Sequence, residues 1–428
     1  MIPMREIFKS GLFRFLFTGF NFLAGLFIAG FSGTHVFGII SLMVANAAVF
    51  HIITGLGFDS SIVWHGASSR FSPFKIFTVT FLSAITQILL FVAVSYIYSR
   101  ITGHLFLSKL SAGTGFYYEL FYFSGLVLLD KYGSMLYAQH KSVICNKVLL
   151  LITFIGFVFL ALCWFKLIHV VVDPFIFFCL FTFLQAASLI LLYHFKNNIR
   201  LIPFTKDDIS SFLGFSFIVF ITNLIQFIAY RLDYWLISYY LDNDHVGVYA
   251  QANKFAQLLW VIPNIIAALA APALLSGKSN FKEKDFAGIT RTLNYLNLLL
   301  TGGVILTALI VYTNFLPNEF SKGFRPLLFM LPGFYFFTIT LLLAAYFSAK
   351  RLLWVNFTGS FICLAIISIS DIILIPRLGI EGAAWANTIA YATATTFNII
   401  MFLKISKIPV SDLFRFKKED WNIFNKLT

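Results

Sequence analysis

The chain has 428 residues, of which 59% are hydrophobic and only 11% are charged. Because soluble globular proteins carry charge on about 25% of their residues, this composition excludes a water-soluble fold of this length and indicates a membrane protein. The formal net charge of +13 comes without a basic run interleaved with stacking aromatics outside the apolar stretches, which argues against nucleic acid as a partner.

Apolar stretches long enough to cross a membrane follow one another along the chain. A spanning helix needs about 20 mostly apolar residues. The stretches that qualify are approximately 12–32, 36–58, 76–98, 115–138, 147–168, 172–194, 211–237, 246–272, 291–313, 326–347, 354–375 and 381–403. The fourth is the least apolar, because it contains Glu119, Asp130 and Lys131. The sequence therefore predicts an all-α polytopic membrane protein with about twelve transmembrane helices.

Lys and Arg are distributed unevenly over the predicted loops. Twenty-one lie in the even-numbered loops and the termini, and six in the opposite loops. Cytoplasmic loops are enriched in these residues, so we expect a protein of the cytoplasmic (inner) membrane with both termini in the cytoplasm. The first helix follows Arg5 and Lys9 without a small-residue cleavage pattern, which predicts that it stays uncleaved. The tail 406–428 is predicted to lie on the membrane as an interfacial helix or to remain solvated.

The cysteines give no sign of a metal site or a disulfide framework. Cys145, Cys163, Cys179 and Cys363 all lie in apolar stretches and lack zinc-type spacing. We expect them to be small apolar side chains in packed helices, and we predict no cofactor and no metal.

The two halves of the chain share short segments at a nearly constant offset. Val36 to Ile40 reads VFGII and His245 to Tyr249 reads HVGVY, an offset of 209 at the glycine. Tyr137 to Asn146 reads YAQHKSVICN and Phe347 to Asn356 reads FSAKRLLWVN, an offset of 210 when Lys141 is aligned with Arg351. These matches predict a duplicated six-helix unit.

A duplicated unit with an even number of helices gives two lobes of the same orientation. We expect an N-terminal lobe at 1–198 and a C-terminal lobe at 199–405. Parallel repeats of this kind enclose a central cavity and move about it, so the repeat predicts transport by alternating access.

Several segments resemble one family. Asp233 to Ser276 contains an aspartate-led helix, Val246-Gly247-x-Tyr249, Ile262-Pro263 and a later Pro272. Leu374 to Trp385 reads LIPRLGIEGAAW, and Gly55 to Trp64 reads GLGFDSSIVW. These segments resemble the polysaccharide (O-antigen and capsule) flippases of the multidrug/oligosaccharidyl-lipid/polysaccharide exporter superfamily. The likeness extends over roughly residues 10 to 400 and specifies the fold better than the substrate.

The resemblance implies a MATE-like fold and a flippase. Such a protein moves undecaprenyl-diphosphate-linked oligosaccharide across the membrane for O-antigen, lipopolysaccharide or capsule synthesis. The implied partners are this lipid-linked substrate, membrane lipid, and the polysaccharide polymerase with its chain-length machinery.

A diphosphate substrate needs cationic groups in a polar cavity, and charges within membrane spans are rare enough to be informative. Arg231 and Lys254 lie at similar predicted depths in antiparallel helices, so we interpret them as the diphosphate site; pairing with Asp233 or snorkelling is the alternative. Lys131 either faces the cavity or snorkels, and Arg14 either receives the diphosphate or anchors the first helix.

Carboxylates within or near the spans are candidates for ion coupling or for structural ion pairs. They are Glu119, Asp130, Asp233 and Asp371. Amides of Asn21, Asn46, Asn223, Gln226, Gln251 and Asn253 are candidates for binding sugar hydroxyls, or for hydrogen bonds between helices.

Two other functions fit parts of the sequence. Asp242 to Asp244 has the form of a D-x-D metal-phosphate motif, which would suit a polysaccharide polymerase or a membrane glycosyltransferase, but the loop around it is short. A multidrug or cation antiporter with the same fold is the second alternative. Against it, the first span has no carboxylate between Leu12 and Ser32.

Overall fold

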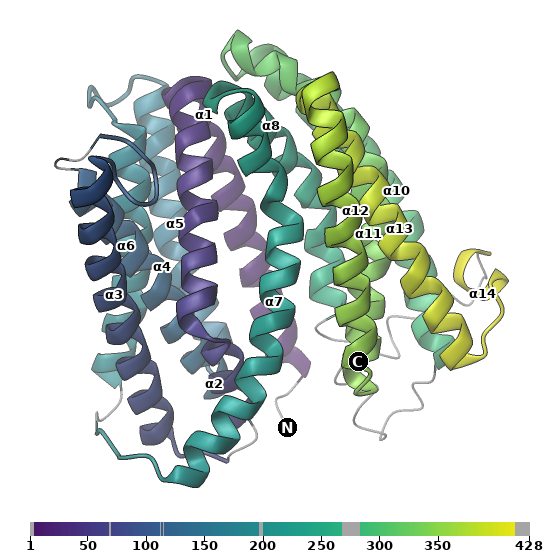
Figure 1. Cartoon of the computed structure of the whole chain (residues 1–428), viewed down its shortest axis with the longest axis horizontal. Coiled ribbons are helices and arrows are strands. Elements are labelled where there is room, and N and C mark those ends of the chain that lie inside the picture. The colour runs from purple at the N-terminus through teal and green to yellow at the C-terminus, as the bar shows by residue number, and fades with distance from the viewer. Residues whose placement is uncertain are drawn as a thin grey trace. The chain divides into compact units, whose positions relative to one another are not determined.

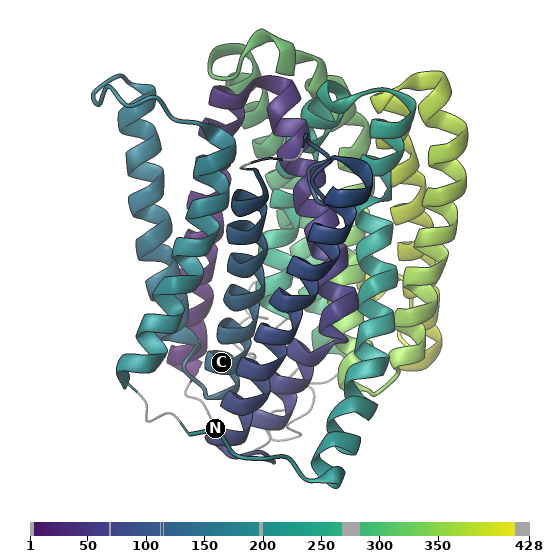
Figure 2. The same ribbon diagram turned by 60° about the vertical axis from the view of Figure 1, so that its left-hand side comes forward.

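The computed structural model describes residues 4–67, 70–111, 113, 115–196, 200–267 and 283–415, and these residues are predominantly helical (Figures 1 and 2). The helices are α1 (Met4–Gly55), α2 (Phe58–Ala67), α3 (Pro73–Thr102), α4 (Gly115–Ala138), α5 (Ser142–Trp164), α6 (Pro174–Lys196), α7 (Lys206–Tyr240), α8 (Asn243–Gln257), η1 (Leu258–Trp260), α10 (Glu283–Asn314), η2 (Asn318–Gly323), α11 (Phe324–Ala349), α12 (Leu353–Leu378), α13 (Ile380–Ser406) and α14 (Ser411–Phe414).

Within these residues, nine helices are long and apolar enough to span a membrane. The first is α1, whose 52 residues include a break at Gly33 with φ 65°. At about 1.5 Å per residue, α1 is more than twice as long as the roughly 30 Å hydrocarbon core of a bilayer, so it contains two of the predicted spans. Helix α4 coincides with the predicted span 115–138; it is not among these nine, and it contains Glu119, Asp130 and Lys131. The predicted class, an all-α polytopic membrane protein, is confirmed.

The chain forms two compact units, residues 1–224 and 225–428. Helix α7 contributes to both. Its first turns belong to the N-terminal unit, where Lys75 Nζ lies 2.6 Å from Asp208 Oδ2 and Ser61 Oγ donates a 3.2 Å hydrogen bond to the Phe212 carbonyl. The N-terminal unit packs around aromatic and aliphatic side chains of α3, α4 and α6, and the C-terminal unit around those of α10, α11 and α13.

The same helix pairings recur in the two units. Helix α4 packs on α3 and α6, and α11 packs correspondingly on α10 and α13. The α4–α5 and α11–α12 connections also share a turn: His140 and Arg351 both adopt a left-handed backbone, with φ 60° and 59°. In each turn the backbone N–H of the following residue donates a 2.8 Å hydrogen bond to the carbonyl of the residue five positions before it. This geometry pairs Arg351 with His140, one residue before the Lys141 of the sequence alignment.

The first residues of the predicted tail pack against the rest of the C-terminal unit. Leu413 is 2% exposed in the core formed with α10 and α13, and Tyr295 Oη donates a 2.8 Å hydrogen bond to the Phe414 carbonyl. The remainder of the predicted interfacial tail, with Trp421 and Phe424, lies outside the described residues, as does Pro272. All four cysteines are buried.

Candidate functional site

Each unit contains a cluster of polar side chains within its helices. The N-terminal cluster consists of His51 (α1), Asp59 (α2), Gln87 (α3), Asp130 and Lys131 (both α4). The C-terminal cluster consists of Arg231, Asp233, Tyr234 (all α7), Tyr249, Lys254 (both α8), Asp371 (α12) and Asn387 (α13).

The N-terminal cluster is a network of ion pairs. Lys131 is fully buried, and its Nζ lies 3.1 Å from Asp59 Oδ1. His51 Nε2 lies 3.3 Å from Asp130 Oδ2 and 3.7 Å from Asp59 Oδ2, while its Nδ1 is 2.9 Å from Gln87 Oε1. The Lys131 ammonium and a ring nitrogen of His51 therefore each face a carboxylate, and a carboxylate partner stabilises a buried cation within a membrane.

The cluster brings together two neighbouring residues of α4. Asp130 and Lys131 project about 100° apart on their helix. Both reach the same cluster, because Lys131 extends to Asp59 while Asp130 contacts His51. The cluster borders a cavity of about 180 Å³, which Asn223 also lines.

Asp233 is fully buried at the centre of the C-terminal cluster. Its Oδ2 accepts a 2.6 Å hydrogen bond from Tyr249 Oη and a 3.1 Å hydrogen bond from Asn387 Nδ2. Its Oδ1 accepts a 2.9 Å hydrogen bond from the backbone N–H of Tyr234. These hydrogen bonds to Asp233 all come from neutral donors, and Arg231 lies within electrostatic range of the same carboxylate.

Arg231 and Lys254 lie in the same part of the C-terminal unit. The Arg231 guanidinium donates a 2.7 Å hydrogen bond to Tyr234 Oη and stacks on its ring, with the charged carbon 4.8 Å from the centroid. Lys254 is partly buried and close enough to Arg231 for the two cations to repel one another.

Asp371 differs from the other buried carboxylates. It is fully buried on α12, and neither of its oxygens has a hydrogen-bond partner among the residues that the structure describes. It lies within electrostatic range of Asp233. The side-chain carbonyl oxygen of Asn387 is another buried acceptor with no donor in the described part of the chain. Asp371 and Asn387 thus present acceptor oxygens on two helices that pack together.

The two remaining candidates lie apart from these clusters. Glu119 is fully buried and accepts hydrogen bonds from the backbone N–H groups of Leu107 and Ser108, at 3.1 and 2.6 Å. It therefore holds the loop before α4. Arg14 is exposed near the start of α1 and stacks on Phe17, 5.1 Å from the ring centroid.

Asp242 of the D-x-D segment caps α8. Its carboxylate accepts a 2.9 Å hydrogen bond from the backbone N–H of His245 and lies 2.7 Å from His245 Nδ1. Partial desolvation acts to raise the pKa of Asp242, but the hydrogen bonds from His245 outweigh it and hold this pKa below its usual value. An N-cap accounts for this aspartate, so the segment does not support the enzyme alternative.

Sequence reasoning missed several members of the clusters. His51 and Gln87 lie within predicted spans, where any strongly polar side chain signals a buried contact. Asp59 was noticed only as part of the GLGFDSSIVW segment. Tyr249 and Asn387 gave no usable signal, because uncharged polar residues are common in this chain.

Several solved structures share this fold at low sequence identity. The lipid II flippase MurJ in an inward closed conformation superposes with a TM-score of 0.66 and 16% identity, covering 99% of this chain and 96% of MurJ. An inward-facing multidrug resistance MATE family transporter of the MOP superfamily gives 0.64 and 12%, covering 91% and 94%. The Vibrio cholerae MATE transporter VcmN in the bent form gives 0.61 and 12%, covering 96% and 98%. At these identities the likeness establishes a shared transporter fold.

Comparison at the level of sequence identifies the family. No individual curated protein matches the chain. The family description "polysaccharide biosynthesis protein" matches residues 32–320, which includes the whole N-terminal cluster and the α7 and α8 residues of the C-terminal cluster. Because this match covers more than half of the sequence, the chain belongs to the polysaccharide biosynthesis protein family and has the fold of MurJ and the MATE transporters of the MOP superfamily.

Proposed function

We propose that this protein is a flippase that moves undecaprenyl-diphosphate-linked oligosaccharide across the cytoplasmic membrane by alternating access, for surface polysaccharide synthesis. Membership of a polysaccharide biosynthesis family and the likeness to MurJ, a lipid II flippase, support this assignment. The oligosaccharide-lipid is anionic at its diphosphate, so the protein must offer positive charge within the membrane.

The observation that carries the proposal is the pair Arg231 and Lys254. Both cations are partly buried and lie close enough to repel one another, with Asp233 within electrostatic range of Arg231, and charge within a membrane span is costly. A bound diphosphate relieves the repulsion, and charge-assisted hydrogen bonds to phosphate oxygens are among the strongest that proteins make. The stacking of Arg231 on Tyr234 orients its guanidinium without neutralising it.

The other cations have different roles in this proposal. Lys131 already faces Asp59, so we assign it to holding α2 against α4. Arg14 is exposed near the cytoplasmic end of α1 in the predicted orientation, where it suits a first contact with the diphosphate.

We propose that Asp233 and Asp371 couple transport to a proton or a monovalent cation. The oxygens of Asp371 and the side-chain carbonyl of Asn387 are buried acceptors without donors in the described structure, and Asp233 lies within electrostatic range of Asp371. Oxygen ligands suit hard cations, and an added positive charge would relieve the repulsion between the two carboxylates.

Surface polysaccharide in a strain that depends on this gene tests the cation pair. Arg231→Ala and Lys254→Ala should each abolish polymer at the surface while the protein stays in the membrane at normal abundance. Lys350→Ala is the matched control, because Lys350 is exposed and pairs with Glu283 at 2.7 Å; it should leave polymer unchanged. Normal polymer with both cation variants would refute the diphosphate site.

A multidrug antiporter is the second candidate, because the MATE transporters share the fold. Expression in a drug-sensitive strain separates the two functions. The flippase assignment predicts unchanged drug susceptibility, whereas resistance that disappears with Asp371→Asn would favour the antiporter.

A further inference from the structure

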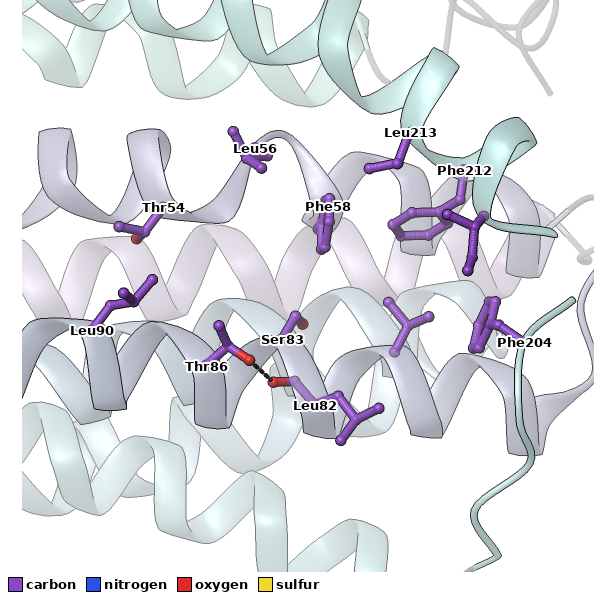
Figure 3. A pocket seen from close by; sticks show the side chains of 12 residues that line it. Thr54, Leu56, Phe58, Leu82, Ser83, Thr86, Leu90, Phe204, Phe212 and Leu213 are labelled. Carbon is purple, nitrogen blue, oxygen red and sulfur yellow. Dashed lines mark hydrogen bonds between the residues drawn. The ribbon is translucent and has the colours of Figure 1, made fainter. Parts of the chain in front are cut away.

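An elongated apolar groove of about 480 Å³ runs along α3 in the N-terminal unit (Figure 3). We call it the α3 groove. Its walls are α3, the α1–α2 turn and the start of α7, with Phe204 from the preceding connection at one end. Its large apolar side chains include Leu56, Phe58, Leu82, Leu90, Phe204 and Phe212.

The hydroxyl groups that line the α3 groove donate hydrogen bonds to backbone carbonyls of the helices that carry them. Thr54 Oγ1 donates to the Phe50 carbonyl at 2.7 Å, and Thr86 Oγ1 donates to the Leu82 carbonyl at 2.9 Å (Figure 3). Ser83 donates in the same way to the carbonyl of Thr80. The groove therefore offers a ligand apolar contact rather than hydrogen bonds.

The groove is open at the surface of the unit. Leu82 is 53% exposed and Leu90 is 44% exposed, and both belong to α3, a helix that spans the membrane. In Figure 3 the lining residues extend lengthwise along the helices, from Thr54 and Leu90 to Phe204. A trough with this direction accepts an extended hydrocarbon chain that lies parallel to the surrounding lipid chains.

The α3 groove shares one wall with the cavity of the N-terminal cluster. Leu56 and Phe58 line the groove, whereas Gly55 and Gly57 line the polar cavity beside His51. This alternation arises because Leu56 and Gly57 both adopt left-handed backbone, with φ 47° and 73°. Gly57 has no substitute, since a Cβ there would lie 2.4 Å from the Ser216 carbonyl oxygen.

An apolar groove and a polar cavity on two sides of one turn match a molecule that is apolar at one end and polar at the other. The polar cavity exposes the carboxylates of Asp59 and Asp130 and the amide of Asn223, which accept hydrogen bonds from hydroxyl groups such as those of sugars. In the predicted orientation this turn lies toward the cytoplasmic side, where a lipid-linked oligosaccharide starts its passage.

We propose that the α3 groove binds the polyprenyl chain of the lipid-linked substrate. This inference rests on the proposed flippase function and adds the place where the hydrocarbon part is held. The aromatic rings of Phe58, Phe204 and Phe212 give broad apolar contact to a methyl-branched chain, and the adjoining polar cavity receives the part of the molecule that carries sugar.

Photolabelling of the full-length protein in vesicles of phosphatidylethanolamine and phosphatidylglycerol tests the proposal. The probe is a sugar-linked polyprenyl diphosphate with a photoreactive group on its chain, and the comparison probe is phosphatidylethanolamine with that group on an acyl chain. The polyprenyl probe should label peptides 79–90 and 204–213, and unlabelled polyprenyl diphosphate should suppress this labelling. The phospholipid probe should label the lipid-facing helices evenly.

A pair of variants on α3 provides the control. Leu82→Trp fills part of the groove and removes apolar contact with the bound chain. Labelling should therefore fall by about tenfold. Leu89→Trp adds the same bulk at a residue that is 62% exposed and does not line the groove, so labelling should stay within about twofold of wild type.

Equal labelling of the groove by both probes would identify a site for ordinary membrane lipid and overturn the proposal, as would unchanged labelling of Leu82→Trp. The experiment separates the groove proposal from the flippase assignment. A protein that flips oligosaccharide-lipid without groove labelling refutes only the groove, whereas groove labelling without flipping refutes the function.

Discussion

Buried charges in this protein are held in two different ways. In the N-terminal cluster, Lys131 faces Asp59 and His51 lies between two carboxylates, so positive and negative groups are matched. In the C-terminal cluster, Arg231 and Lys254 repel one another and Asp371 has no hydrogen-bond partner in the described structure. Because a carboxylate partner stabilises a buried cation within the membrane, we assign Lys131 to holding α2 against α4. The proposed diphosphate and coupling sites lie in the second cluster.

The matched pair gives a stability prediction. Lys131→Met removes the ammonium that lies 3.1 Å from Asp59, which should lower the free energy of unfolding by about 3–5 kcal/mol. The double variant Asp59→Asn with Lys131→Met removes both charges and should recover most of that loss. Denaturant titration of the purified protein in detergent measures the difference. A double variant that is less stable than Lys131→Met alone would contradict the assignment.

Asp371 gives a prediction about coupling. Asp371→Asn keeps the shape of the side chain but removes its charge, so flipping should no longer respond to an imposed proton or sodium gradient. Binding of the substrate should change little, because Arg231 and Lys254 are intact. Transport assayed with and without a gradient measures the effect; a variant that still follows the gradient would exclude Asp371 from coupling.

Charged residues of the candidate site were easier to predict from the sequence than the neutral residues that contact them. Arg231, Lys254 and Asp233 stood out because charge is rare within spans. Tyr249 and Asn387, which hold Asp233, are residue types that occur throughout the chain, so their roles depend on helix packing that a single sequence does not reveal.

At the scale of elements, the LIPRLGIEGAAW segment joins α12 to α13 through a close contact. Helix α12 ends at Leu378, and Gly382 lies in the first turn of α13. A Cβ on Gly382 would lie 2.3 Å from the Leu374 carbonyl oxygen. The segment that resembles a family motif is thus explained by packing between the last two helices, which brings Asp371 and Asn387 onto adjoining elements.

This contact predicts a destabilised variant. Gly382→Ala forces backbone atoms apart, so it should lower the free energy of unfolding by about 2 kcal/mol or more. Gly303→Ala is the control, because Gly303 lies within α10 with open space where its Cβ would be; it should be neutral or stabilising by up to about 1 kcal/mol. Thermal unfolding in detergent measures both, and equal stability of the two variants would contradict the account.

Element boundaries were predictable where charges or glycines interrupt apolar stretches. The fourth span coincides with α4, which begins and ends at the predicted residues. The expected break between 32 and 36 is present, because Gly33 has a non-helical backbone with φ 65° and separates two helical segments of α1.

At the scale of the whole molecule, the repeated segments mark equivalent turns in the two units. His140 and Arg351 share a left-handed backbone and the same hydrogen-bond pattern. Sequence matching found these turns to within one residue because turn geometry restricts the amino acids around it. The identity of the cargo was less predictable, since cavities and grooves form from side chains on many helices.

The predicted orientation in the membrane rests on the distribution of Lys and Arg and is open to direct test. All four native cysteines are buried, which gives a low background for labelling introduced thiols. Arg70→Cys should react with a membrane-impermeant maleimide only from the cytoplasmic side, and Lys109→Cys only from the opposite side. Both positions are exposed. Labelling from the reverse sides would contradict the predicted topology.

The central claim is that the cations of α7 and α8 carry an anionic lipid-linked sugar through the membrane. Reconstitution of the pure protein into vesicles, with a fluorescent polyprenyl-diphosphate oligosaccharide in one leaflet, measures this most directly. We predict that wild-type protein makes the sugar accessible to a reagent on the far side, and that Arg231→Ala/Lys254→Ala reduces the rate to that of empty vesicles. Equal rates for the wild type and this double variant would contradict the account.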